Sequence, residues 1–330
     1  MMPMLALRGA RNTLLTIFAL FCIVGPLYAA FEKIPFGIAI PVSIAFALEA
    51  SMYAACGIGS ARKFIGERLR GPVLAPALTL SAALPYSIYA VPTGTFEWRA
   101  FALLMALAAA VSFWYIVFPR HWAADIAFVA LIAAVVLSGA FSFIYATPFH
   151  KLPLVIFGQL MWTRVSIFAA LLIARMDVKG FGFLPSRKEW KAGALNFLLF
   201  VPCGVLLNWG TGFGTFHPHP TGWWQMTGTA VLTFLGMLWV VALREEFFFR
   251  GLLQEWFEKW TRSKWAGLVI AAVAFGSVHL PFRGFPNWRF ALMAALAGLF
   301  FGRAYMTTRS VRAAMIAHAL VNTFWRVLFS

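Results

Sequence analysis

The chain has 330 residues, of which 62% are hydrophobic and only 12% are charged, whereas soluble domains are about half apolar and about a quarter charged. This composition excludes an ordinary soluble protein and indicates an integral membrane protein. The net charge of +16 would suggest nucleic acid as the partner of a soluble protein, but here the basic residues separate hydrophobic runs, which is typical of membrane topology. We therefore expect membrane lipid, and no nucleic acid, as a partner.

Hydrophobic runs follow one another along most of the chain. A spanning helix needs about 20 apolar residues, and about eleven runs are close to that length. They cover residues 14–31, 36–59, 73–91, 99–119, 122–146, 153–174, 192–210, 226–256, 265–281, 288–306 and 311–329. The sequence therefore predicts an all-α fold, a polytopic transmembrane bundle of about eleven helices.

Two of the N-terminal runs contain a charge. Glu49 lies in the run 36–59 and Arg164 in the run 153–174. A charge inside the membrane is a functional hypothesis by default, but no motif surrounds either residue. We expect a structural ion pair or a water-lined crevice there.

The distribution of Lys and Arg predicts the orientation. When the N-terminus is placed in the cytoplasm, most basic loop residues fall on the cytoplasmic side. An odd number of spans then puts the C-terminus on the opposite side. The basic, Gly-containing stretch 174–193 is the strongest internal break. We take it to separate an N-terminal six-helix membrane block of unknown role, residues 1–190, from a C-terminal five-helix block, residues 191–330.

The run 226–256 contains "VVALREEFFFRG" at 240–251, with two adjacent glutamates in apolar surroundings. Glu246 and Arg250 are four residues apart and share one helix face, with the acid on the N-terminal side, which suits an ion pair. Glu245 is turned about 100° away. A buried charge is costly when it is alone, so the second glutamate needs another partner or a function.

Two later runs contain the other unusual polar residues. "FGSVH" places Phe275 four residues before His279, and "HALVN" places His318 four residues before Asn322. Counted at about 1.5 Å per residue along each helix, these groups lie at a depth similar to that of Glu245, near mid-membrane. We expect them to converge with the glutamates in one cavity.

The chemistry that suits this set is hydrolysis without a Ser or Cys nucleophile. A carboxylate can take a proton from water, a histidine can orient the water or protonate a leaving amine, and a His–Asn pair can stabilise an oxyanion. Glutamate and two histidines also form a zinc ligand set, but the H-E-x-x-H spacing is absent.

In this order, "EEFFFR", "FGSVH" and "HALVN" resemble the three motifs E-E-x-x-x-R, F-x-x-x-H and H-x-x-x-N of the CPBP family. That family comprises CAAX prenyl proteases of type II, the Ras-converting type, and bacteriocin-processing or immunity proteins. The resemblance covers the block 191–330. It implies an intramembrane endopeptidase of glutamic type that cleaves membrane-associated, prenylated or otherwise lipidated proteins or peptides.

The resemblance also implies roles for individual residues. Glu245 would be the catalytic base, His279 its assistant, and His318 with Asn322 the oxyanion-stabilising pair. The supporting residues would be Glu246, Arg250 and Phe275. No cofactor and no metal ligand are expected, although zinc is an alternative because the family was once described as metalloproteases.

Two alternative functions other than proteolysis remain open. The chain could be a transporter or proton relay that uses buried Glu, His and Arg, although such proteins often contain a repeat and none is visible here. It could also be a non-catalytic immunity or binding factor on the same fold.

Overall fold

The computed structural model describes residues 2–217 and 222–329, and it is helical throughout that range except for loops and one isolated bridge between Phe216 and Phe329. The predicted all-α fold is confirmed. Two compact units, Met1–Asp177 and Val178–Ser330, divide the chain within the basic stretch 174–193. The assignment of separate roles to 1–190 and 191–330 stays a prediction.

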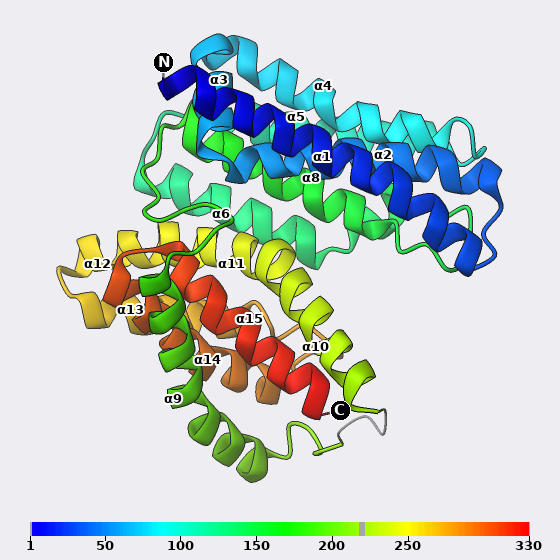
Figure 1. The fold of residues 1–330 in the computed structure, drawn as a ribbon. Coiled ribbons are helices and arrows are strands. Elements are labelled where there is room, and N and C mark those ends of the chain that lie inside the picture. Colours follow the sequence, from blue (N-terminus) through cyan, green and yellow to red (C-terminus); the bar gives the residue numbers. More distant parts are fainter. Residues whose placement is uncertain (1, 218–221, 330) are drawn as a thin grey trace. The chain divides into compact units, whose positions relative to one another are not determined.

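The N-terminal unit is built mainly from long apolar helices (Figure 1). Its elements are α1 (Met2–Phe31), α2 (Phe36–Gly57), α3 (Gly59–Arg68), α4 (Gly71–Ala90), α5 (Trp98–Val117), α6 (Trp122–Leu137), α7 (Ala140–Ile144) and α8 (Val155–Phe168), which continues as the π-helical turn η1 (Ala169–Ile173). α2 packs against α1, α4 and α8. Tyr86, Tyr89, Tyr145 and Phe157 form a buried aromatic cluster beside these helices.

The two intramembrane charges of this unit form an ion pair. Arg164 Nε lies 2.6 Å from Glu49 Oε1, and each side chain is only 1% exposed. Arg164 also donates to the Ser81 hydroxyl at 2.6 Å and to the Ser81 carbonyl at 3.0 Å. That carbonyl lacks its helical donor because Pro85, four residues later, has no N–H. The expected structural ion pair is thus confirmed.

The C-terminal unit contains the three motifs. Its elements are α9 (Arg187–Thr211), α10 (Trp223–Gly236), the π-helical η2 (Met237–Ala242), α11 (Leu243–Phe248), the π-helical η3 (Phe249–Gln254), α12 (Glu255–Thr261), α13 (Lys264–Ser277), α14 (Trp288–Thr308) and α15 (Val311–Leu328). A capping box starts α9, since Ser186 and Glu189 each accept the other's backbone N–H. α9, α14 and α15 pack side by side (Figure 1).

Eight helices in the described residues are long and apolar enough to cross a membrane, against about eleven runs predicted from length alone. Two of the other three runs form shorter apolar helices, the 16-residue α6 and the 14-residue α13. The third, α15, has 18 residues but contains His318, Asn322 and two arginines, which lower its hydropathy. With eight candidate spans, the chain is an integral membrane protein.

Candidate active site

The two glutamates sit on α11, a short α-helical segment between the π-helical segments η2 and η3. Together with α10 and α12 these segments form one continuous helical run, Trp223–Thr261. A π-helical turn inserts an extra residue into the i→i+4 pattern and often occurs at functional sites. Here the turns on both sides of α11 set the rotation of Glu245 and Glu246 relative to the rest of the run.

Glu246 is completely buried and has two strong partners. Arg250 Nη1 donates to Glu246 Oε1 at 3.1 Å, and Arg250 Nε lies 3.1 Å from Oε2. His318 Nδ1 lies 2.6 Å from Oε1. The predicted Glu246–Arg250 ion pair is confirmed. With both oxygens contacted by other side chains, Glu246 is fixed in place.

Arg250 is held on several sides. Its Nη2 donates to the Gly298 carbonyl at 3.1 Å, and its guanidinium carbon lies 4.6 Å from the Phe275 ring centroid and 5.4 Å from that of Phe301. A Cβ on Gly298 would come within 3.3 Å of Nη2. The glycine therefore allows the close contact between α14 and the charged pair.

His318 connects the two glutamates. While Nδ1 contacts Glu246, Nε2 lies 3.9 Å from Glu245 Oε2. The imidazole stacks on Phe301, with centroids 4.6 Å apart and an interplanar angle of 11°, and meets the edge of Phe275 at 5.7 Å. Two aromatic rings and the Glu246 carboxylate surround His318. Its Nε2 has no such partner and faces Glu245.

Glu245 has a looser environment than its neighbour. Its side chain is 19% exposed, against 0% for Glu246. Arg244 Nη2 lies 3.5 Å from Oε1, so the preceding arginine does reach this carboxylate. Its other oxygen, Oε2, lies 3.9 Å from Nε2 of His318. Glu245 is the one of the two carboxylates that has an exposed surface.

His279 lies in the turn after α13, because that helix ends at Ser277 and not at residue 281 as the run 265–281 predicted. Its Nδ1 is 2.7 Å from the Phe275 carbonyl. A carbonyl only accepts, so Nδ1 carries the proton and Nε2 is the open nitrogen. Phe275 also touches the rings of His279 and His318, which makes it the residue that spaces the two histidines.

Asn322 lies one turn beyond His318 on α15. Its Nδ2 donates to the sulfur of Met237 at 3.7 Å, a weak acceptor. Among the described residues Asn322 makes no hydrogen bond to His318, so the two are related by the shared helix face only. The amide of Asn322 therefore retains hydrogen-bonding capacity for another group.

The sequence analysis did not predict that α14 contributes to the site. This helix contributes none of the three motifs, yet it supplies the Gly298 carbonyl to Arg250 and the Phe301 ring to His318. A signal for it exists in "GLFFG", where Gly298 and Gly302 have the G-x-x-x-G spacing of close helix contacts in membranes. Sequence reasoning that follows polar residues alone does not detect it.

The zinc alternative requires two imidazole nitrogens and a carboxylate at one point. Nδ1 of His279 is engaged by the Phe275 carbonyl and Nδ1 of His318 by Glu246, which leaves one nitrogen on each ring. Among the described residues, no group of three or more His, Cys, Asp or Glu side chains is arranged to hold a metal ion. A zinc-bound histidine uses one ring nitrogen and commonly gives the other to a carbonyl or carboxylate, so the expectation of no metal ligand stays a prediction.

A comparison with models of protein families gives a match to the C-terminal unit. Residues 227–324 match the family model described as type II CAAX prenyl endopeptidase Rce1-like. Neither the search of curated proteins nor that of solved structures found a match. The matched segment contains all three motifs, from Glu245 to Asn322. The C-terminal unit of this membrane protein therefore contains an Rce1-like domain, which is similar to the type II CAAX prenyl endopeptidases.

Proposed function

We propose that the chain is an intramembrane endopeptidase in which Glu245 activates a water molecule to cleave a peptide bond of a membrane-associated or lipidated substrate. The observation that carries this proposal is the unequal environment of the two glutamates. Glu246 is enclosed by Arg250 and His318, whereas Glu245 is partly exposed and has one oxygen 3.9 Å from the open nitrogen of His318. A base has to contact water, and of the two carboxylates only Glu245 has an exposed surface.

The proposed reaction begins with proton transfer from water to Glu245 as the water oxygen attacks the scissile carbonyl. The carbonyl oxygen becomes an oxyanion. It accepts hydrogen bonds from Nε2–H of a protonated His318 and from the amide of Asn322. Glu246 supports this step from the other side of the ring, because a carboxylate 2.6 Å from Nδ1 holds the imidazole in place.

Collapse of the tetrahedral intermediate breaks the C–N bond, and the leaving nitrogen takes up a proton. Glu245 can return the proton it received, directly or through His279. The fixed Nδ1–H of His279 on the Phe275 carbonyl leaves Nε2 free to accept and donate that proton. No metal ion takes part in this scheme, and its absence from the mechanism is part of the proposal.

The test is cleavage of a library of matched prenylated, acylated and unlipidated peptides by purified protein in lipid vesicles. We expect wild type to cleave membrane-bound peptides, and Glu245→Gln to lose about 10²–10⁴-fold in turnover, the contribution typical of a catalytic base. Glu67→Gln is the matched control, because Glu67 is an exposed residue paired only with Lys63.

Two outcomes would overturn the assignment. Near-normal cleavage by Glu245→Gln, with a stable but inactive Glu246→Gln, would show that the roles of the two glutamates are reversed. If wild type cleaves no peptide of any class, the chain is a non-catalytic binding factor or a transporter. A measurement of proton-coupled uptake into the same vesicles then distinguishes a transporter from a binding factor.

A further inference from the structure

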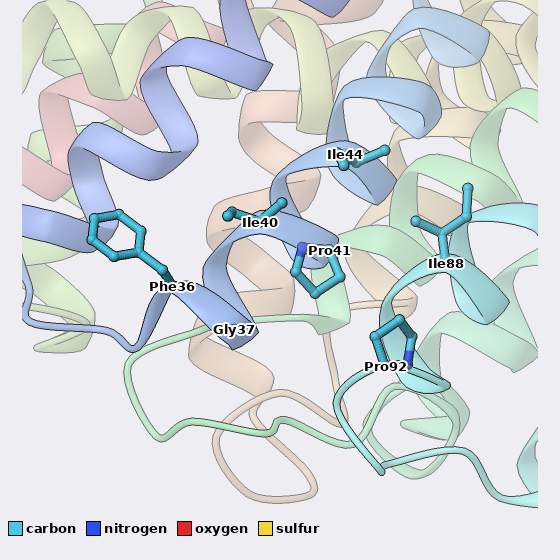
Figure 2. Close-up of a pocket in the computed structure, with 7 residues that line it drawn as sticks. All are labelled: Phe36, Gly37, Ile40, Pro41, Ile44, Ile88 and Pro92. Carbon is cyan, nitrogen blue, oxygen red and sulfur yellow. The ribbon is translucent and has the colours of Figure 1, made fainter.

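An apolar groove of about 430 Å³ lies between α2 and α4 in the N-terminal unit (Figure 2). The residues that line it include Ile40, Ile44 and Ile88, and none of the lining residues has a polar side chain. A specific binding site needs a few polar groups that orient the ligand. Its side chains therefore give this groove no selectivity, in contrast to the turn between α13 and α14, where polar contacts converge on His279.

The turn between α13 and α14 contains His279 near its beginning and Asn287 at its end. The backbone N–H of Asn287 donates to the Leu280 carbonyl at 2.8 Å, and its side-chain Nδ2 donates to the Phe282 carbonyl at 3.0 Å. Both bonds join the end of the turn to its beginning. Because residues 281–286 are exposed, hydrogen bonds from Asn287, and not burial, hold the turn in shape.

The other end of the Asn287 side chain starts α14. Asn287 is the N-cap of this helix, and its Oδ1 accepts the backbone N–H of Phe290 at 3.1 Å. An asparagine at an N-cap satisfies one of the free N–H groups of the first turn. Here a single orientation of the amide serves both contacts, because only the oxygen can accept from Phe290 and only the nitrogen can donate to Phe282.

The rings of these two phenylalanines contact the imidazole of His279. The His279 ring centroid lies 4.9 Å from that of Phe290 and 5.5 Å from that of Phe282. Phe275, on the preceding helix, contributes a third ring at 4.8 Å. Of these three rings, two have their backbone fixed by the side chain of Asn287.

The beginning of α14 also packs directly against the end of α13. A Cβ on Gly276 would lie 2.5 Å from the Ala291 carbonyl and 2.7 Å from the Ala295 Cβ. The first turn of α14 is thus held close to the helix that precedes His279. The Asn287 cap belongs to the same first turn, which carries Phe290 toward the imidazole.

We propose that Asn287 is a positioning residue for His279, which it keeps in its reactive orientation by fixing Phe282 and Phe290 with the two ends of one amide. This inference rests on the proposed transfer of a proton through His279 Nε2. The bond from Nδ1 to the Phe275 carbonyl sets the tautomer, and the surrounding rings restrict rotation of the imidazole. Misplacing a reacting group by about 1 Å can cost roughly 10²-fold in rate, so a residue that acts only through packing can change turnover.

Two substitutions separate the two ends of the amide. Asn287→Ser keeps a good cap and removes the donor to the Phe282 carbonyl, whereas Asn287→Ala removes both contacts. With full-length protein in vesicles and a peptide that wild type cleaves, Asn287→Ser should keep KM and Tm and lose about 10–10²-fold in kcat. Asn287→Ala should lose kcat as well and lower Tm by about 2–4 °C. Ser263→Ala, which removes the cap of α13, is the matched control and should lower Tm alone.

A second background shows whether Asn287 acts through His279. The variant His279→Gln lacks the proposed proton-transfer group. Adding Asn287→Ser to it should change kcat by less than about twofold, because residues that act as one unit are not additive. An equal loss in both backgrounds would show that Asn287 acts only on the fold and would overturn the proposal. So would a wild-type kcat in Asn287→Ser.

A measurement without turnover separates this inference from the proposed function. In protein that contains ¹⁵N-labelled histidine, the ring signals of His279 are those that His279→Gln lacks. We expect wild type to show one tautomer of His279, protonated at Nδ1, and Asn287→Ser to show both tautomers. If wild type cleaves no peptide, the proposed function fails, and the spectrum still tests the positioning. An unchanged His279 spectrum in Asn287→Ser would contradict it.

Discussion

Replacing Glu246 by glutamine removes one charge from a completely buried cluster and keeps its shape. Arg250, itself 1% exposed, then has no anionic partner. Breaking a buried ion pair by neutralising one member costs about 3–5 kcal/mol, because the remaining charge stays desolvated. The Gly298 carbonyl and the faces of Phe275 and Phe301 still contact the guanidinium, which places the expected loss at the lower end, about 3 kcal/mol.

This loss is large enough to measure by thermal unfolding in detergent. In a unit of roughly 150 residues, 1 kcal/mol changes Tm by about 2–4 °C. Glu246→Gln should therefore lower Tm by about 6–12 °C. Activity should fall as well, because His318 Nδ1 loses its carboxylate partner.

Glu245→Gln is the matched control, one residue away and with the same chemical change. Its ion pair with Arg244 spans 3.5 Å and both side chains are partly exposed, so the pair is worth about 1 kcal/mol or less. We expect a Tm within about 4 °C of wild type. If the two variants had the same Tm, the ion pair with Arg250 would contribute nothing to the stability of the fold, and the reasoning from burial would be refuted.

Four further predictions concern other parts of the molecule. Arg164→Met should lower Tm, because Glu49, only 1% exposed, then has no positive partner. Adding Glu49→Leu should recover most of the loss, since replacing both members of a buried ion pair by apolar residues is often neutral. A double variant that is no more stable than Arg164→Met would contradict this. Asn322→Ala should reduce kcat about 10²–10³-fold with little change in Tm, whereas an equal fall in both quantities would indicate a structural role. Elemental analysis of active protein should find no stoichiometric zinc; one zinc per chain, with activity lost on its removal and restored on its return, would reverse the proposed mechanism. Reporter fusions should place the N-terminus in the cytoplasm and the C-terminus on the opposite side, as the eleven runs predicted from the sequence require. Both ends on one side would show an even number of crossings, which the eight candidate spans would give.

The ion pairs within the spans could be predicted because a single unpaired charge in the membrane costs free energy. Helix spacing identified Glu246 with Arg250, and the cost of isolated intramembrane charge predicted a partner for Glu49 and Arg164. The structure contains both pairs. What spacing could not give is the contact of His318 with Glu246, 72 residues apart in the chain, because the rotation of one helix against another depends on packing.

The number of spans was predicted less well than the fold class. Length and apolarity alone could not separate helices that face lipid from helices that lie inside the unit. α15 illustrates the reason, since most of its residues from Val311 to Val321 are buried and its polar face meets α11. The spacing of apolar residues also could not predict the π-helical segments on either side of α11. A single inserted residue changes the helical register without changing the composition.

The pairing of two adjacent glutamates in an apolar helix has a physical explanation in their unequal burial. Consecutive residues on a helix point about 100° apart, so one segment can present one carboxylate to the interior and the other to a water-accessible side. Glu246 fixes Arg250 and His318 from the buried side, and the same histidine faces Glu245 with its other nitrogen. An apolar residue in place of Glu246 would remove the partner of His318 Nδ1, and an apolar residue in place of Glu245 would remove the proposed base. Neighbouring positions suit the two acids because one imidazole lies between them, 2.6 Å from Glu246 and 3.9 Å from Glu245.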